Sequence, residues 1–422
     1  MIKKAKAKYQ QHKETIDNFF WRSLQIGAKQ GIIFLIFILC AKLLSPYDFG
    51  IYNYVLAIVF FLIIFGDFGI STATSKYVAE YNVTDKKKLK LVLFNSGIII
   101  LALTIIISIL TLIIGPWYLK DKYVYVLYLL PLIFLAPMTS LYDGIYRGLK
   151  RFKQLAIIST MVGLISIVFV YILISKYGLI GALISQNLFY LILLISIGLG
   201  YRDFEVKWNK SVMKEVGRYS FIYGLAIIGN YLFIRFGILL LGYYNYIEEI
   251  ATYELLTKIF MLLLFPFTLL GQVVAPNFAV LSAKREFKKV YNKSIKYTLT
   301  FFVTGLILGL LFYLIMPLIF KVYFPEYYAK NYFNITFLLC LIIYITNVWA
   351  ATFDAGILIP TGYASLMAKF YLILGIFGSI LSIILINYFG YIGVVYSFTI
   401  CSFLMAVGLR VIYFIKIKDF NG

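Results

Sequence analysis

Residues 91–114 read LVLFNSGIIILALTIIISILTLII and contain no charged side chain. A bilayer-spanning α-helix needs about 20 consecutive, mostly apolar residues, because the helix rises about 1.5 Å per residue and the hydrocarbon core is about 30 Å thick. Stretches of this kind recur from Ser23 almost to the C-terminus. They predict an all-α integral membrane protein.

The composition excludes an ordinary soluble domain. Of the 422 residues, 62% are hydrophobic and 14% are charged, whereas soluble domains have about a quarter of their residues charged. The net charge of +21 could suggest nucleic acid as a partner. Basic patches that bind phosphate backbones sit on soluble modules, however, and none is present, so we expect no nucleic-acid partner and assign the charge to loops.

The cysteines give no sign of a metal site or a disulfide framework. Cys40, Cys340 and Cys401 fall in apolar stretches without metal-ligand spacing, and we expect neither a metal nor another cofactor. The basic N-terminal segment runs into an apolar stretch without a small-residue cleavage motif, so the first helix is expected to stay in the mature protein.

Hydropathy, with breaks at charge clusters and at Gly and Pro, predicts about twelve membrane-spanning helices. Six are expected in the first half of the chain, near residues 23–44, 51–70, 91–114, 123–146, 155–174 and 178–199. Six more follow, near residues 218–241, 250–274, 296–319, 332–357, 364–386 and 391–414. The loops between them are short, so the helices themselves must carry the function.

The Lys/Arg distribution predicts the orientation, because cytoplasmic loops are enriched in positive charge. With both termini in the cytoplasm, 30 of the 39 basic residues fall in inner segments and five in outer loops. The remaining four lie within predicted spans: Lys29, Lys42, Arg235 and Lys258. We therefore expect a multi-pass protein of the cell membrane with cytoplasmic termini.

An internal repeat relates the two halves. Residues 177–185 (YGLIGALIS) resemble residues 389–397 (FGYIGVVYS) at an offset of 212 residues, although chance recurrence in a Gly-rich apolar sequence is the alternative. Because six is an even number, each half starts and ends on the same side, and the repeat is parallel, as in some transporters. The predicted organisation is a basic N-terminal segment, a six-helix bundle, a linker, a second six-helix bundle and a tail, at residues 1–22, 23–200, 201–217, 218–415 and 416–422.

Several motifs carry a resemblance to a known family. They are AKLLSPYDFGIY at residues 41–52, GDFGI at 66–70, DGIYRG at 143–148 and the paired Gly-x-x-Gly segments of the repeat. With these motifs and the span count, the chain resembles the polysaccharide and O-antigen flippases of the superfamily that also contains multidrug and toxin extrusion transporters. The resemblance implies two six-helix bundles leaning into a V around a central cavity. It also implies that the protein transports a polyprenyl-linked saccharide by alternating access.

Ionisable side chains inside a span cost about 2.5–3.5 kcal/mol on insertion scales and usually face a cavity or a partner. Lys29 in the first span and Asp67 in the second are expected at similar depth. They could form a structural ion pair. Alternatively, Lys29 could contact a substrate phosphate, with Asp67 tuning its charge.

Arg235 is the strongest candidate for substrate binding, because it lies deep in the seventh span and keeps its charge under all conditions. Asn230 lies about one turn below it, and Glu254 and Lys258 of the eighth span are expected at comparable depth. One alternative is a local Arg235–Glu254 ion pair. We favour a cavity-lining cluster of net charge +1, which would suit an anionic diphosphate because Arg binds phosphate oxygens bidentately.

Two further acids lie near the inner ends of their spans. Asp143 precedes Arg147 by four residues, which predicts an ion pair on one helix face. Asp354 has Leu358 at the corresponding position and therefore lacks that partner. It is either a solvated interfacial acid or a site for a coupling ion, H⁺ or Na⁺.

These features favour a flippase that moves a polyprenyl-(di)phosphate-linked oligosaccharide. We expect membrane lipids to surround the protein. A cation-coupled multidrug exporter of the same fold is the alternative. A membrane glycosyltransferase or polymerase is disfavoured, because such chemistry needs carboxylates or histidine at a site with room for a nucleophile. The single histidine, His12, lies in the basic N-terminal segment, and no residue is assigned a catalytic role.

Overall fold

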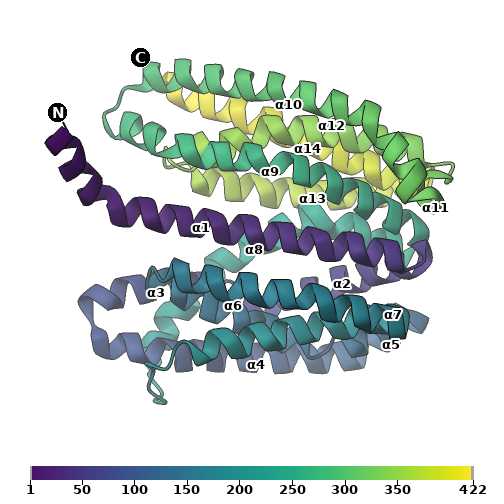
Figure 1. Ribbon diagram of the computed structural model, residues 1–422, viewed down its shortest axis with the longest axis horizontal. Coiled ribbons are helices and arrows are strands. Elements are labelled where there is room, and N and C mark those ends of the chain that lie inside the picture. Colours follow the sequence, from purple (N-terminus) through teal and green to yellow (C-terminus); the bar gives the residue numbers. More distant parts are fainter. Residues whose placement is uncertain (1, 420–422) are drawn as a thin grey trace. The chain divides into compact units, whose positions relative to one another are not determined.

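The computed structural model describes the backbone of residues 2–419 and the side chains of residues 21–415, except those at positions 23, 222, 272, 351, 352, 355 and 364. The described chain is mostly helical and contains no strand (Figure 1). Its first elements are α1 (Ile2–Leu43), α2 (Pro46–Asp67), α3 (Ile70–Thr84), α4 (Lys86–Leu119), η1 (Lys120–Lys122), α5 (Tyr123–Tyr128), α6 (Leu132–Gly148) and α7 (Phe152–Leu199). The others are α8 (Lys210–Tyr243), α9 (Ile247–Ala283), α10 (Phe287–Tyr323), α11 (Pro325–Tyr328), α12 (Phe333–Phe353), η2 (Asp354–Leu358), α13 (Ala364–Phe389) and α14 (Tyr391–Asp419).

The helices account for the predicted number of spans. In the described residues, ten helical segments are long and apolar enough to cross a membrane. One of them, α7, is broken at Gly178, where φ is 54° and ψ is −130°, and so supplies two spans. The helix α6, which has 17 residues, adds another. The prediction of an all-α protein with about twelve membrane-spanning helices is confirmed.

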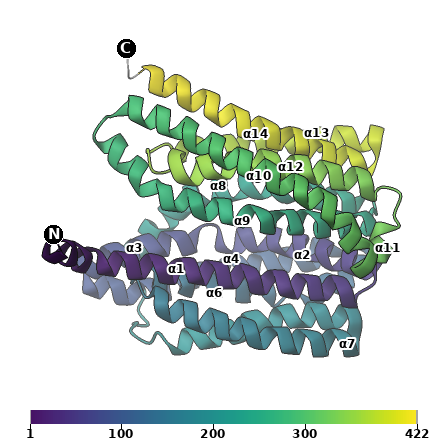
Figure 2. The ribbon, with the colours of Figure 1, turned by 45° about the horizontal axis from the view of Figure 1, so that its top comes forward.

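The chain forms two compact units. Unit 1 contains the chain up to Asp48 together with Val55–Ile227, and unit 2 contains Phe49–Tyr54 and the chain from Ile228 onward. In unit 1, α1 packs along α7, and α6 packs against α3, α4 and α7. In unit 2, α12 packs against α9, α10 and α14, and α13 packs against α14 (Figure 2). The chain therefore changes unit on either side of Phe49–Tyr54 in α2 and again inside α8.

The internal repeat is present in the backbone as well as in the sequence. Gly178 (φ 54°, ψ −130°) and Gly390 (φ 56°, ψ −140°) adopt nearly the same conformation, which side chains with a Cβ rarely adopt. Three residues later, a Cβ on Gly181 would lie 2.0 Å from the Leu173 carbonyl oxygen, and one on Gly393 would lie 2.2 Å from that of Leu385. Each Gly-x-x-Gly segment therefore turns the chain sharply and lets two helices pack closely.

The GDFGI segment forms the break between α2 and α3. Phe68 (φ 40°) and Gly69 (φ 80°) are both in the left-handed region, so α2 ends at Asp67 and α3 begins at Ile70. The first part of α8 packs closely here, because a Cβ on Gly69 would lie 2.9 Å from the Ser220 carbonyl oxygen. This contact brings α3 and the first half of α8 together within unit 1.

The segment that leads into α8 is also fixed to unit 1. The buried Asn95 of α4 donates through Nδ2 to the Lys207 carbonyl (2.9 Å) and accepts through Oδ1 from the Asn209 amide (2.8 Å). Lys90 forms an ion pair with Asp203 at 3.5 Å. The sequence analysis placed a linker at residues 201–217, and in the structure its first part lies along the beginning of α4.

Large apolar side chains are exposed along whole helix faces. They include Ile113 (62%), Leu314 (69%) and Leu318 (67%). A water-soluble protein rarely exposes continuous apolar surface of this extent. These faces of α4 and α10 therefore suit contact with lipid hydrocarbon.

Candidate functional site

The charged cluster centred on Arg235 lies in unit 2, on α8 and α9. Arg235 Nη1 and Glu254 Oε1 are 2.5 Å apart, and the side chains are 26% and 4% exposed. The ion pair considered in the sequence analysis is therefore formed. A buried carboxylate of this kind requires its cation, because removing one partner of a buried pair costs about 3–5 kcal/mol.

Lys258 adds a second cation to the cluster. It lies one helical turn after Glu254 on α9, and the charges of Arg235 and Glu254 both act on it. Two cations and one carboxylate leave a net charge of +1. The half-buried Asn230 lies further along α8 and makes no hydrogen bond with the described residues.

Arg235 has N–H donors that the ion pair with Glu254 does not use. A guanidinium carries five N–H donors in a fixed planar arrangement, and only the Nη1 bond to Glu254 is formed with the described side chains. Because Arg235 is 26% exposed, its remaining donors can reach a ligand. The cluster can therefore bind an anion without breaking the Arg235–Glu254 pair.

Lys29 and Asp67 do not form the ion pair weighed in the sequence analysis. Asp67 instead accepts hydrogen bonds from the backbone amide (3.0 Å) and the hydroxyl of Ser71. Lys29 is exposed, and no carboxylate of the described residues lies within ion-pair distance. The pairing failed because depth along a helix does not determine the direction in which a side chain points.

A polar network joins α1 and α6 in unit 1. Arg147 Nε lies 2.7 Å from Asp143 Oδ2, which confirms the predicted pair. Gln25 Nε2 donates to Asp143 Oδ1 at 3.4 Å, and Arg22 donates to Gln25 Oε1. Burial lowers the pKa of the Arg22 guanidinium, and the Asp143 carboxylate opposes this shift. The sequence analysis missed this network, because Gln25 of α1 and Asp143 of α6 are 118 residues apart in the sequence.

Asp354 is not the solvated interfacial acid that the sequence analysis considered first. It is 9% exposed and begins η2, a π-helical turn. Such turns are rare and frequently occur at functional sites. Its electrostatic partner is the buried Arg410 of α14, to which it forms no hydrogen bond in the described structure.

Arg410 is held by the helices around it. Its Nη1 donates to the Ala406 carbonyl at 2.7 Å, and its Nη2 donates to the Trp349 carbonyl. The guanidinium lies 4.9 Å from the ring centroid of Trp349 and 4.7 Å from that of Phe353. The sequence analysis missed this partner of Asp354, since it treated Arg410 as an inner basic residue.

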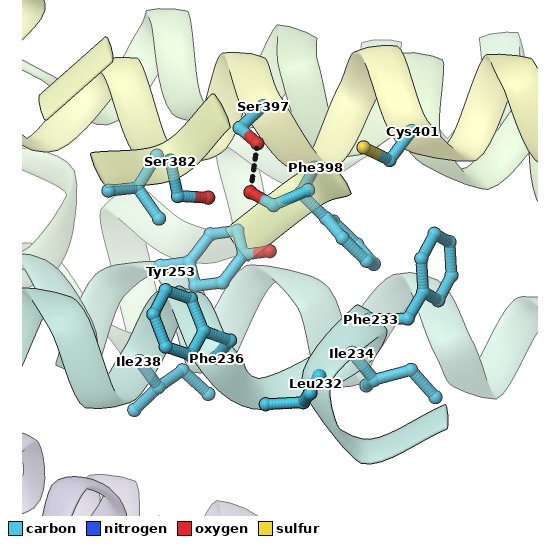
Figure 3. Close-up of a pocket in the computed structure, with 13 residues that line it drawn as sticks. Leu232, Phe233, Ile234, Phe236, Ile238, Tyr253, Ser382, Ser397, Phe398 and Cys401 are labelled. Atoms are coloured by element: carbon cyan, nitrogen blue, oxygen red, sulfur yellow. Dashed lines mark hydrogen bonds between the residues drawn. The ribbon is translucent and has the colours of Figure 1, made fainter. Parts of the chain in front are cut away.

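A small pocket lies between α8, α9, α13 and α14 (Figure 3). Its lining includes Phe233, Tyr253, Ser382, Phe398 and Cys401, and its volume is about 20 Å³. That volume suffices for about one water molecule. The pocket is therefore too small for a saccharide.

The described side chains offer no metal site, because no three His, Cys, Asp or Glu residues among them come close enough to hold an ion. The three cysteines are buried and free. The charged residues brought together are thus ion pairs and neighbouring cations within each helical unit.

The fold defines the class of protein: an all-α, multi-pass membrane protein. The chain is similar to an inward-facing multidrug resistance MATE family transporter (15% identity, 94% of this chain and 98% of that chain, TM-score 0.78). It is also similar to the lipid II flippase MurJ in an inward closed conformation (20% identity, 97% and 89%, TM-score 0.71). A third similar structure is a MOP superfamily transporter from Pyrococcus furiosus (16% identity, 97% and 96%, TM-score 0.63). At these identities the likeness establishes the fold alone.

The family follows from the sequence itself. The family described as "Polysaccharide biosynthesis protein" matches residues 15–282, and the chain belongs to that family. A comparison with curated proteins finds no significant match. The resemblance to polysaccharide flippases and the predicted fold class are confirmed.

Proposed function

We propose that this protein is a flippase that moves a polyprenyl-(di)phosphate-linked oligosaccharide from the cytoplasmic to the outer leaflet by alternating access. The observation that carries the proposal is the Arg235, Glu254 and Lys258 cluster, which places a net positive charge among the helices of unit 2. Membership of the polysaccharide biosynthesis family supports a saccharide substrate. The fold shared with the lipid II flippase supports a lipid-linked one.

Arg235 is the residue that recognises the diphosphate. Arg–phosphate pairs are often bidentate and charge-assisted, which adds both energy and geometry. Glu254 holds the guanidinium through Nη1 and leaves other donors for phosphate oxygens. Lys258 supplies a second charge to the diphosphate, while Asn230 and Lys29 contribute polar contacts along its path.

Asp354 is the residue that takes up the coupling ion, H⁺ or Na⁺. When a carboxylate and a cation are both buried, their energy changes strongly if either charge changes, because neither group is solvated by water. The π-helical turn gives its backbone an alternative hydrogen-bonding arrangement. Asp67 accepts its hydrogen bonds from Ser71 in unit 1 and is not assigned to substrate contact.

Transport in proteoliposomes tests this function. Purified protein is reconstituted with a fluorescent polyprenyl-diphosphate sugar, and the label that becomes accessible on the opposite leaflet is measured by chemical quenching. We expect exchange well above that of protein-free vesicles. Exchange at the rate of protein-free vesicles, with folded protein present, would exclude a flippase.

The alternative is a multidrug exporter, which the similarity to a multidrug resistance transporter favours. Cationic drugs suit acidic cavities, whereas the Arg235 cluster carries a net positive charge. The same vesicles loaded with a cationic dye separate the two functions. Dye efflux without exchange of the lipid-linked sugar would establish the exporter.

The flippase is placed in the cell membrane with both termini in the cytoplasm. The Lys/Arg bias of the loops supports this orientation. Its action is transport without chemistry, so no residue is given a catalytic role. Its partners are the lipid-linked oligosaccharide, the surrounding lipids and the coupling ion.

A further inference from the structure

A cluster of aromatic rings and one lysine lies between α3 and the first half of α8, entirely within unit 1. We call it the tyrosine–lysine patch and define it as Lys76 and Tyr77 of α3 with Tyr219 and Tyr223 of α8. None of these residues belongs to the charged cluster of unit 2. The patch therefore needs its own explanation.

The rings of the patch form a continuous series. The centroids of Tyr77 and Tyr219 are 6.2 Å apart in an edge-to-face arrangement, and Tyr219 stacks on Tyr223 at 6.1 Å with an interplanar angle of 18°. Tyr223 is 44% exposed. One end of the series therefore presents an aromatic surface to a ligand.

Lys76 is held over this series. Its Nζ lies 4.4 Å from the centroid of Tyr219 and 4.7 Å from that of Tyr77. These distances are within the range of cation–π attraction, so the ammonium is positioned before any ligand arrives. Among the described residues no carboxylate pairs with it.

The acidic side chain of α8 beside the patch is already engaged. Glu215, one turn before Tyr219 on α8, forms an ion pair with Lys88 at 2.9 Å. It also accepts hydrogen bonds from the hydroxyls of Tyr81 and Ser211. Lys76 is consequently the cation of this surface that remains available to an anion, whereas Lys88 is neutralised.

The position of the patch suits the membrane surface. The 22 residues of α2 span about 33 Å, enough for the hydrocarbon core. The helix α3 continues for 15 residues, or about 22 Å more. On the predicted orientation, Lys76 and Tyr77 lie near the cytoplasmic headgroups.

An aromatic belt of the bilayer interface is the simpler explanation for tyrosines at this depth. Belt residues anchor a helix individually in the headgroup region. Here three rings pack on one another across two helices and fix an ammonium between them. This arrangement resembles a ligand site, with aromatic surface and a few placed polar groups.

We propose that the tyrosine–lysine patch binds the sugar phosphate of the lipid-linked substrate on the cytoplasmic side, before translocation. The exposed ring of Tyr223 packs against the first sugar, and Lys76 pairs with a phosphate oxygen. The inference rests on the proposed function, to which it adds an initial binding site in unit 1.

Binding measurements test the proposal directly. The full-length protein in nanodiscs is titrated with farnesyl diphosphate and with farnesyl-diphospho-N-acetylglucosamine. The test variant is Lys76→Gln with Tyr223→Leu. The matched control, Lys176→Gln with Tyr177→Leu, removes an exposed lysine and an exposed tyrosine from another part of unit 1.

The two probes separate the two contacts. Lys76→Gln alone should weaken binding of both probes about tenfold or more, as expected for a bond between charged groups. Tyr223→Leu alone should weaken only the sugar-bearing probe, by about two- to tenfold, as for an aromatic packing contact. Tyr223→Trp and Lys76→Arg should retain binding, which also shows that the site tolerates substitution.

Unchanged dissociation constants in the Lys76→Gln/Tyr223→Leu variant would overturn the proposal, and so would an equal loss in the control. The flipping assay keeps the two inferences apart. If the wild type flips the substrate and the double variant flips it with unchanged KM, the patch is excluded and the flippase function stands. If the wild type does not flip, the proposed function fails irrespective of binding.

Discussion

The guanidinium of Arg235 lies 2.5 Å from the carboxylate of Glu254, and the Glu254 side chain is 4% exposed. If either residue is changed alone, its charged partner loses this ion pair and remains largely buried. Structural and functional effects of Arg235 must therefore be separated by changing both residues.

Arg235→Ala should abolish nearly all flipping and lower the free energy of unfolding by about 3–5 kcal/mol, because Glu254 is left buried and unpaired. Arg235→Lys should keep part of the activity, since it retains the charge but loses the planar fork. Flipping is measured in proteoliposomes and stability by thermal unfolding in detergent.

The double change Arg235→Ala with Glu254→Ala distinguishes the two roles. We expect it to recover stability, because no unpaired acid remains, and to stay inactive, because the phosphate contact is gone. Wild-type flipping by a well-folded double variant would show that Arg235 is only a structural ion-pair partner.

Asp354 and Arg410 should be coupled in stability. Arg410→Ala removes the cation whose charge acts on the buried Asp354 and should therefore lower the free energy of unfolding. Arg410→Met with Asp354→Asn should recover most of this loss. Additive effects of the two changes in thermal unfolding would disprove the coupling.

The role of Asp354 in ion coupling has its own test. Asp354→Asn should abolish the response of transport to an imposed H⁺ or Na⁺ gradient while leaving slow exchange of the substrate down its gradient. Flipping rates are compared with and without the gradient in the same vesicles. An Asp354→Asn variant that still responds to both gradients would remove Asp354 from the coupling site.

The glycines of the repeat should be intolerant of alanine. A Cβ at Gly181 or Gly393 would meet a carbonyl oxygen at 2.0 Å or 2.2 Å, so Gly181→Ala and Gly393→Ala should each destabilise by at least about 1–3 kcal/mol. Gly31→Ala in α1 is the matched control, since nothing lies within 4 Å of its added Cβ. It should be neutral or stabilise by about 0.5–1 kcal/mol. Equal melting temperatures of all three variants would contradict the close packing.

The predicted orientation can be checked by labelling single cysteines. Substitutions at Lys87, Lys150, Lys210 and Lys288 should react only from the cytoplasmic side. Those at Asp48, Glu248 and Glu326 should react only from outside. A reversal at any one position would be incompatible with the predicted alternation of the loops.

The sequence by itself determined the features that depend on neighbouring residues. The length and apolarity of each stretch determine whether it can cross a bilayer, so about twelve spans could be predicted from hydropathy. The Gly-x-x-Gly repeat predicted two related halves, and Gly178 and Gly390 share a backbone conformation. The Asp143–Arg147 pair followed from the helical repeat alone.

Contacts between helices were decided only by the tertiary structure. The charge of Arg410 acts on Asp354 from a distant helix, whereas Lys29 and Asp67, expected at similar depth, form no ion pair. Likewise the edge-to-face contact of Tyr77 with Tyr219 depends on how closely α8 approaches α3 at Gly69. Hydropathy reports how deep a residue lies, but the rotation of each helix about its axis depends on packing with its neighbours. For this reason the spans could be read from the chain, while most partners of its charged and aromatic side chains on other helices could not.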